Sequence, residues 1–363
     1  MNTLETSKKL FERYESLYHV IDYYGLFALY ALSRTAIVAE DSVLLDKCIH
    51  MLSLYPDNFD HPRYNFDAYK VGGNGKAFLA YKGYFNDQLE KIRMYAEKTM
   101  NAPKEENGIL CYPTLPDNQM VWIDVVTAVT PFMLYAGLTL KEDKYIDFAA
   151  EQCFKMYEML LDRSCGLLHQ SKGFMPDGSL MSHDHWSRGN GWGYIGLTEL
   201  IENLPKNSKH REKAEKYFCD LSKAFIKYQN DRGVWRQEIT WDYSWEEASG
   251  TGIIAYGLGV GLRTGILDKK TYEKPFKHAI NGIINYFINN NYSTNMGCSG
   301  CCCPGEGDEK GTIKAYLTKV YPINDEPHSF GALILALTEA HRNGITEAQK
   351  THRLYFEREN AIR

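Results

Sequence analysis

The chain alternates two kinds of apolar segment along most of its length. In the first kind, apolar residues fall at every third or fourth position and charged residues fill the others, which predicts a surface helix with one buried stripe. Six segments follow this pattern, at residues 3–18, 41–54, 88–100, 144–162, 211–230 and 274–290.

The second kind starts at a polar or charged residue and then stays apolar on all sides, with many Gly and Ala residues. Its six members are residues 22–32, 67–84, 124–138, 188–200, 247–262 and 325–340. About sixty residues separate successive starts, which is the length of one helical hairpin with its loops. Such helices are expected to be enclosed and closely packed.

Six enclosed helices that alternate with six amphipathic ones predict an all-α fold, the (α/α)6 barrel. An open α-solenoid would also alternate, and it stays as the alternative. The barrel is favoured because six hairpins is the number at which such toroids close. No Ser-, Pro- or Gly-rich linker interrupts the chain. We therefore expect one catalytic domain over residues 1–345, followed by a helical tail at 346–363.

The rim at which the enclosed helices begin carries the residues that suit chemistry. Short extended segments that start at Gly108, Gly166 and Gly233 each precede an enclosed helix. Helix N-termini around one rim present free N–H groups, an arrangement that favours an anion. The cation Arg188 starts one of these helices, and its planar guanidinium suits a carboxylate.

Aromatic residues gather near the same helix starts. All six tryptophans lie between residues 122 and 245, and tyrosine is abundant, with 26 copies. Five tryptophans flank the helix starts, namely Trp122, Trp186, Trp192, Trp241 and Trp245. Stacking against sugar rings explains this position, and structural packing of the rim is the alternative.

Acidic residues begin the other enclosed helices. They are Asp22, Asp67, Asp124, Glu247 and Asp325. Each one alone is explained as a helix cap. Together with the tryptophans they suggest glycosidic chemistry, in which carboxyl groups give and take protons. Asp124 is the best candidate, since its apolar neighbours would raise its pKa.

Four motifs resemble those of the unsaturated rhamnogalacturonyl hydrolases of glycoside hydrolase family 105, which are related to the unsaturated glucuronyl hydrolases of family 88. They are Val121-Trp-Ile-Asp124, Gly166-Leu-Leu-His169, Trp186-Ser-Arg-Gly-Asn-Gly-Trp192 and Glu247-Ala-Ser-Gly250. Asn324-Asp-Glu-Pro-His328 fits as well, and the resemblance covers residues 15 to 345.

The resemblance implies an (α/α)6 barrel with no metal or cofactor. It implies that Asp124 is the general acid/base and Asp67 its partner carboxylate. It also places His169, Arg188 and Trp192 in the sugar pocket. We expect four further residues in the same pocket, namely Trp122, Trp186, Asp22 and His328.

The implied substrate is a small oligosaccharide whose anionic terminal uronic acid carries a C4=C5 double bond made by a lyase. Asp124 would protonate C4, and water would add at C5, after which the aglycone leaves. The chain departs from the family pattern at Gln170-Ser-Lys and in the cysteine-rich segment 297–305. These departures leave rhamnose, galactose or a glycosaminoglycan residue open as the neighbouring sugar.

Charge and cysteine content limit the partners and the compartment. The formal net charge of −5 argues against nucleic acid, and no apolar run is long enough to span a membrane. Nine cysteines, three of them adjacent, suit a reducing compartment, and no secretory signal is visible. We therefore expect a cytoplasmic protein.

Three other functions remain possible interpretations of the sequence. A helical toroid that only binds carbohydrate would need the tryptophans and Arg188 but not an acid in apolar surroundings. A zinc-dependent sugar hydrolase would use Cys298, Cys301, Cys302 and Cys303. A sugar epimerase would use His169 and His328 as an acid–base pair.

Overall fold

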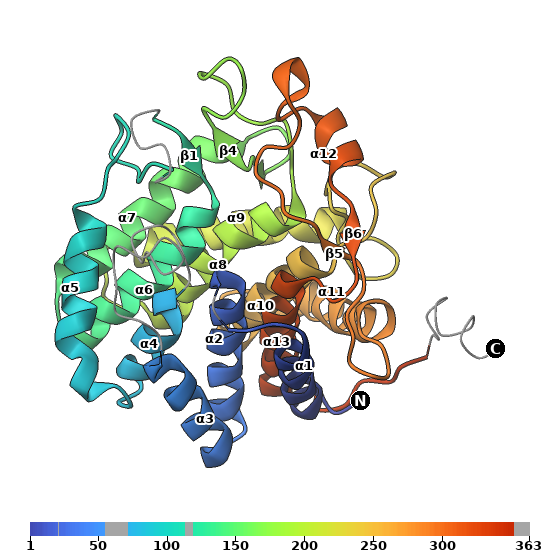
Figure 1. Ribbon diagram of the computed structural model, residues 1–363. Coiled ribbons are helices and arrows are strands. Elements are labelled where there is room, and N and C mark those ends of the chain that lie inside the picture. The colour runs from blue at the N-terminus through green and yellow to red at the C-terminus, as the bar shows by residue number, and fades with distance from the viewer. Residues whose placement is uncertain (21, 55–71, 113–118, 352–363) are drawn as a thin grey trace.

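The computed structural model describes residues 1–20, 22–54, 72–112 and 119–351. Within these ranges, the long helices form two concentric layers (Figure 1). The inner layer consists of α2 (Tyr23–Val38), α4 (Gly72–Tyr81), α6 (Asp124–Leu140), α8 (Ser187–Asn203), α10 (Ala248–Thr264) and α13 (Pro327–Arg342). The outer layer consists of α1 (Thr3–Leu17), α3 (Ser42–Ser53), α5 (Leu89–Met100), α7 (Asp143–Leu160), α9 (Arg211–Tyr228) and α11 (Lys269–Gly282). The predicted alternation of the two kinds of helix is confirmed.

The inner helices form a closed ring. Each one contacts the next along the chain, and α13 returns to pack against α2. At this seam the hydroxyls of Thr35 and Thr338 lie 2.7 Å apart. A solenoid would leave its first and last repeats apart, so the (α/α)6 barrel is confirmed and the open alternative is wrong.

Small residues explain why the inner helices pack so closely. A Cβ atom on Gly252 would lie only 2.7 Å from the carbonyl carbon of Ala332, so α10 and α13 touch through their backbones there. A Cβ on Gly331 would lie 2.5 Å from the ring of Phe27 on α2. A glycine is required at both crossings, which accounts for the small-residue content of the enclosed segments.

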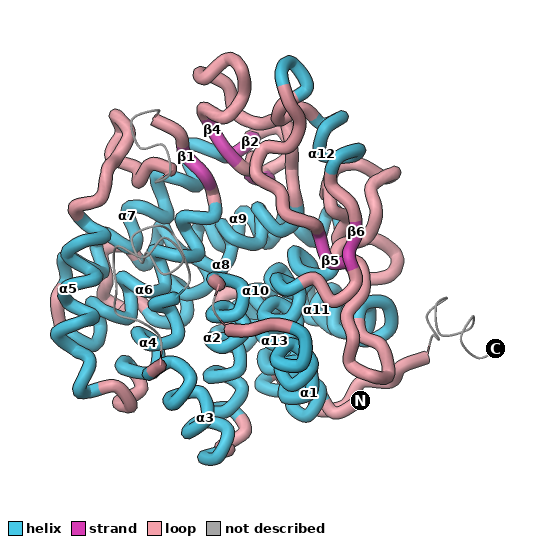
Figure 2. The backbone as a smooth tube through the Cα atoms, viewed as in Figure 1, coloured by secondary structure: helices cyan, strands magenta, loops and turns pink. Residues whose placement is uncertain are grey.

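Short strands occupy the end of the barrel at which the inner helices begin (Figure 2). Within the described residues they form three antiparallel pairs, each two residues long. The pairs are β1 (Val121–Trp122) with β4 (Ser171–Lys172), β2 (Leu161–Asp162) with β3 (Leu167–Leu168), and β5 (Gly297–Cys298) with β6 (Pro322–Ile323). The short helix α12 (Ile313–Lys319) follows the cysteine-rich segment and was not predicted. One turn of π-helix at Ile283–Phe287 extends α11.

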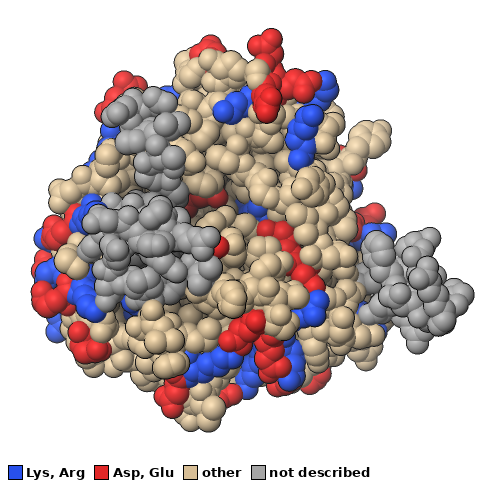
Figure 3. Space-filling model, in the orientation of Figure 1, with Lys and Arg blue, Asp and Glu red and all other residues tan. Residues whose placement is uncertain are grey.

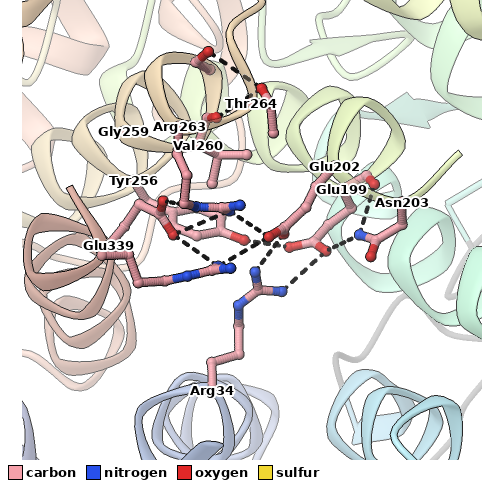
Figure 4. Close-up of polar contacts among 12 residues, drawn as sticks. Arg34, Glu199, Glu202, Asn203, Tyr256, Gly259, Val260, Arg263, Thr264 and Glu339 are labelled. Carbon is pink, nitrogen blue, oxygen red and sulfur yellow. Dashed lines mark hydrogen bonds and ion pairs between the residues drawn. The ribbon is translucent and has the colours of Figure 1, made fainter. Parts of the chain in front are cut away.

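The opposite end of the barrel is closed by a buried network of charges (Figure 4). Arg34 of α2 binds both Glu199 and Glu202 of α8. Arg263 of α10 binds Glu202 and Glu339 through contacts of 2.5 Å each. Three hydroxyls also donate to Glu199, from Tyr30, Tyr135 and Tyr256. The network therefore connects five inner helices, namely α2, α6, α8, α10 and α13, and leaves the other end for a site.

The two ends of the described chain pair with each other. Asn2 forms an antiparallel bridge with Glu347, and the amino group of Met1 donates to the carbonyl of Ala348 at 2.5 Å. Residues 346–351 form no helix, and the backbone of residues 346–348 pairs with the first three residues of the chain. The rest of the predicted tail lies outside the described residues, and the division at 345 stays a prediction.

Candidate active site

Asp124 is the first residue of α6, and the preceding strand holds it in place. β1 pairs with β4, and the N–H of Ile123 donates to the carbonyl of Gln170 at 2.9 Å. Among the described residues, Oδ2 of Asp124 is buried and accepts no hydrogen bond. Burial raises the pKa of Asp124 to about 8, against the positive charge of Arg188 and a hydrogen bond from Trp122. Asp124 therefore carries a proton at neutral pH.

Arg188 lies in the first turn of α8 and is only 2% exposed. Nη1 donates to the carbonyl of Cys298 at 2.7 Å, and Nη2 donates to the carbonyl of Ser299 at 3.1 Å. The guanidinium also lies over the ring of Trp186, at 4.7 Å from its centroid. The carbonyl of Cys298 in β5 and that of the following residue, Ser299, thus hold Arg188 as a fixed cation. Its role as a clamp for a substrate carboxylate stays a prediction.

Three side chains form a hydrogen-bonded chain beside Arg188. Oε2 of Glu326 lies 3.6 Å from Nη1 of Arg188, and Oε1 lies 2.5 Å from Nδ1 of His328. Nε2 of His328 in turn lies 2.5 Å from the hydroxyl of Tyr23. Burial lowers the pKa of His328, although the charge of Glu326 acts the other way. A neutral imidazole that donates to Glu326 can accept a hydrogen bond from Tyr23.

Tyr23 belongs to the same site as Asp124. Burial raises the pKa of Tyr23, the charge of Arg188 opposes this, and Asp124 adds to it. Electrostatic coupling to both groups means that the phenol, the carboxyl and the guanidinium lie near each other. Figure 3 shows that this face of the molecule is hollowed near its centre, with atoms of charged residues inside the hollow.

The predicted tryptophans differ in how much ring they expose. Trp192 is 3% exposed and packs edge-on against Phe27, with ring centroids 5.2 Å apart. Trp186 is buried, and its indole N–H donates to Sγ of Cys298. Trp122 is only partly buried and packs edge-on against Tyr112. Trp186 and Trp192 are therefore part of the packed interior, whereas Trp122 keeps part of its ring exposed. Their contact with a substrate stays a prediction.

Two of the rim acids serve as structural groups. Glu247 caps α10 by accepting from the N–H groups of Ser249 and Gly250. Asp325 forms a 2.6 Å ion pair with Arg13 and accepts from the N–H of Thr294. Both carboxylates thus bind groups of the protein itself, a helix N-terminus in one case and Arg13 with a backbone N–H in the other.

The structure places Asp22 and His169 next to different groups. Asp22 is the N-cap residue of α2 and accepts a hydrogen bond from the hydroxyl of Tyr24 at 2.7 Å. His169 donates from Nδ1 to the carbonyl of Asp184, and its ring centroid lies 5.2 Å from that of His185. His169 and His328 thus contact separate partners, which gives no support to an epimerase pair. Asp67 lies outside the described residues, so its role stays a prediction.

Sequence reasoning assigned no role to three residues of this region, namely Tyr23, Glu326 and Gln170. Pro327 occupies the first turn of α13, and a proline there predicts that the preceding residue caps the helix. This signal would have selected Glu326 instead of Asp325. Nothing in the local sequence singled out Tyr23, because its partner His328 lies 305 residues away.

Gln170 explains how the cysteine-rich segment is held. Its Oε1 accepts from the N–H of Cys303 at 3.0 Å and from the hydroxyl of Tyr316, and its Nε2 donates to the carbonyl of Cys301. All nine cysteines are free thiols. Cys298, Cys301 and Cys303 are buried, whereas Cys302 is exposed. In the described chain, these thiols do not converge as a metal site, so the zinc-dependent hydrolase has no support there.

A carboxyl group that keeps its proton at neutral pH, beside aromatic rings on a barrel of helical hairpins, is the arrangement of an (α/α)6 glycoside hydrolase. The sequence agrees with this class. The model of Glycosyl Hydrolase Family 88 matches residues 7–344, and the chain belongs to that family.

Similar proteins fall in the same group. An unsaturated 3S-rhamnoglycuronyl hydrolase of Formosa agariphila is 31% identical over 170 residues, which is 44% of either chain. A match of this length spans less than half of that relative. A family 105 glycoside hydrolase from C. acetobutylicum superposes with a TM-score of 0.80 over 93% of this chain and 99% of its own, at 22% identity. The unsaturated glucuronyl hydrolase of Bacillus sp. GL1 superposes with a TM-score of 0.65 over 90% and 87%, at 14% identity.

Proposed function

We propose that the protein is a glycosidase that releases a terminal Δ4,5-unsaturated uronic acid from lyase-generated oligosaccharides. The observation that carries the proposal is Asp124, a carboxyl group with a pKa near 8 and one buried oxygen without a partner among the described residues. Such a group donates a proton at neutral pH, which hydration of a double bond requires. The names of the relatives agree with this reaction.

In the proposed reaction Asp124 gives its proton to C4, and the electrons of the C4=C5 double bond form the new C–H bond. The positive charge that results is shared between C5 and the ring oxygen. Water adds at C5 and returns a proton to the carboxylate of Asp124. The hemiketal at C5 then opens, and collapse at C1 releases the aglycone. Asp67 is proposed as the second carboxylate of this step.

The charge of the site supports an anionic substrate. Arg188 is a buried cation, and the N-termini of the inner helices start around it. Trp122 provides partly exposed ring surface on which a sugar can stack. We propose that the uronate end lies between Asp124 and Arg188, and that Trp192, Trp186, Asp22, His169 and His328 shape the pocket.

The neighbouring sugar is proposed to be rhamnose. Two relatives are named unsaturated 3S-rhamnoglycuronyl hydrolases, and a rhamnogalacturonan fragment is the other rhamnose-containing candidate.

Cytoplasmic action is proposed from the nine free thiols, which suit a reducing compartment. In the described chain, every helix is too short or too polar to cross a membrane.

The test is a panel of lyase-generated disaccharides in which the uronate is linked to rhamnose, galactose or a hexosamine. Loss of the enol-ether absorbance reports the reaction, and the rhamnose-linked member should react fastest. In heavy water the released uronic acid should carry deuterium at C4, a label that direct cleavage at C1 does not introduce. Hydrolysis of the matched saturated uronides, or product without deuterium, would refute the proposed mechanism.

A further inference from the structure

The two segments in which the chain departs from the family pattern contact each other in the structure. The side chain of Gln170 donates to the carbonyl of Cys301 at 2.7 Å and accepts from the N–H of Cys303 at 3.0 Å. Cys302 is the residue between these two contacts. Gln170 therefore fixes the backbone on both sides of Cys302.

The backbone of Gln170 also joins this bend of the cysteine-rich segment to the residues around Asp124. Its carbonyl accepts from the N–H of Ile123, the residue that precedes Asp124, at 2.9 Å. On the other side of the bend, Cys303 belongs to a small apolar cluster against which Trp122 packs. The bend therefore lies beside both the proposed proton donor and the partly exposed ring of Trp122.

Packing around Cys303 keeps the bend in one position. A Cβ atom on Gly311 would lie 2.7 Å from Sγ of Cys303, so these two residues are in close contact. The N–H of Gly311 donates to the carbonyl of Pro304, and its carbonyl accepts from the N–H of His183, at 2.8 Å each. Cys302 is therefore presented by a rigid support, as a residue that contacts a ligand with precision requires.

Cys302 differs from the other cysteines in its exposure. All nine cysteines lie in the described part of the chain, and only Cys302 is classed as exposed. Surrounding protein atoms nevertheless desolvate the thiol and raise its pKa to about 12, and the charge of Asp124 adds to this. A side chain that is open to solvent and still desolvated lines a concave surface. The coupling to Asp124 means that this surface belongs to the same hollow as the carboxyl.

The chemistry of the thiol indicates which part of a substrate it suits. With its raised pKa, Cys302 is uncharged at neutral pH and behaves as a small apolar group with a weak S–H donor. Trp122 adds apolar ring surface on the same side of Asp124. Such surroundings favour a methyl group over a hydroxymethyl group, because the extra hydroxyl would lose water without gaining a good partner. A 6-deoxy sugar such as rhamnose carries that methyl group at C5.

We propose that Cys302 contacts the sugar next to the uronate and selects a 6-deoxy sugar there, through packing of the methyl group against the thiol. Gln170 is a positioning residue, because it holds the carbonyl and the N–H on either side of Cys302. The inference rests on the proposed function and adds the residues that choose the leaving sugar. A contact of this size discriminates between substrates by about 10- to 100-fold.

The test compares two synthetic disaccharides in which the same Δ4,5-unsaturated uronate is linked to rhamnose or to mannose of the same configuration, which has a hydroxyl at C6. Wild type should hydrolyse the rhamnose-linked disaccharide with a kcat/KM about 10-fold higher or more. Cys302→Ser should reduce this ratio several-fold, since the hydroxyl replaces an apolar sulfur of similar size. Cys302→Ala stays apolar and should keep more of the preference than Cys302→Ser.

Gln170→Leu tests the positioning role. It should reduce the same ratio, because the bend is no longer held, while the descending limb of the pH profile that belongs to Asp124 stays in place. A general loss of stability would instead lower kcat/KM for both disaccharides equally, which would contradict the positioning role.

Thiol labelling tests the location of Cys302 directly. In the Asp124→Asn variant, which is expected to bind substrate without turnover, the rhamnose-linked disaccharide should slow the reaction of N-ethylmaleimide with Cys302. Mass spectrometry follows the adduct, and the same protein with Cys302→Ser should carry one adduct fewer. A labelling rate that saturating disaccharide does not change would contradict the contact.

Cys219→Ser is the matched control, because Cys219 is a partly buried thiol of the outer helix α9. It should leave the ratio of the two kcat/KM values unchanged, and near-ultraviolet circular dichroism confirms that each variant is folded. Equal ratios in wild type, Cys302→Ser and Cys302→Ala would overturn the inference while the proposed hydrolysis stands. Wild type that hydrolyses neither disaccharide would refute the proposed function, and this inference with it.

Discussion

The hydroxyl of Tyr23 lies 2.5 Å from Nε2 of His328, and this contact joins the first inner helix to the last. Glu326 holds the opposite nitrogen of the same ring. The imidazole is buried, so both of its nitrogens need a partner inside the protein. The contact therefore has a structural role at the ring seam, next to the proposed sugar site.

Tyr23→Phe is expected to lower the free energy of unfolding by about 1–3 kcal/mol, because Nε2 of His328 is left buried without a partner. Urea denaturation of the single and double variants measures this coupling. Tyr23→Phe combined with His328→Leu should cost less than the sum of the two single changes. Strict additivity would mean that the two side chains do not interact.

Asp124→Asn is expected to reduce kcat by about 10²–10⁴-fold, because the amide cannot deliver a proton to C4. Binding of the substrate should persist, which isothermal calorimetry with the unsaturated disaccharide measures. Asp143→Asn is the matched control, since Asp143 also starts a helix but is exposed on the outer layer. Equal activity of Asp124→Asn and wild type would contradict the assignment of the acid.

The pH dependence of kcat/KM is expected to have a descending limb near pH 8. Below this value Asp124 holds its proton, and above it the carboxyl ionises and the free enzyme loses its donor. An initial-rate series from pH 5 to 10 with the unsaturated substrate measures the limb. A limb near pH 4 instead would mean that a carboxyl with an ordinary pKa controls the rate.

Asp124 is also expected to destabilise the fold as the pH rises. Its pKa is near 4 in the unfolded chain and about 8 in the folded one, so the folded state binds more protons between these values. Asp124→Asn should therefore raise the free energy of unfolding at pH 7 by on the order of 2–4 kcal/mol. The gain should vanish below about pH 3, where Asp124 is protonated in both the folded and the unfolded state of wild type. A gain in stability that is independent of pH would show that burial does not raise the pKa of Asp124.

The charge network at the other end of the barrel predicts a large loss of stability. Arg34→Met leaves Glu199 and Glu202 buried with fewer cations and should cost about 3–5 kcal/mol. Lys216→Met breaks an exposed pair with Asp220 and should cost below about 1 kcal/mol. Thermal denaturation compares the two variants. Similar losses in both would contradict the distinction between buried and exposed pairs.

Hydrophobic periodicity was enough to predict the barrel, because each inner helix is apolar on all sides and each outer helix on one. The ends of the helices were less predictable. Asp325 was expected to start the last inner helix, but the structure begins it at Pro327, with Glu326 as the cap. Pro327 marks this start in the sequence, because proline favours the first turn of a helix.

The candidate site was predictable only where a local motif carried it. Asp124 follows from its apolar surroundings, which burial in the structure confirms as the main cause of its raised pKa. The hydrogen-bond partners of Arg188 could not be predicted from a local motif, because they are the carbonyls of Cys298 and Ser299, more than 100 residues away. The positions of the tryptophans in the sequence place them near the starts of the inner helices. They do not tell that Trp186 is buried and that Trp122 keeps part of its ring exposed.

The seam between α13 and α2 has a consequence for the synthesis of the protein. Thr35 meets Thr338 only after almost the whole chain has left the ribosome. Until then, the first hairpins expose apolar flanks that no earlier segment of the nascent polypeptide can cover. Contacts of such long sequence separation form slowly, and exposed flanks of this kind aggregate. The topology therefore leaves these flanks open to aggregation until the final hairpin has been synthesised and has packed against α2.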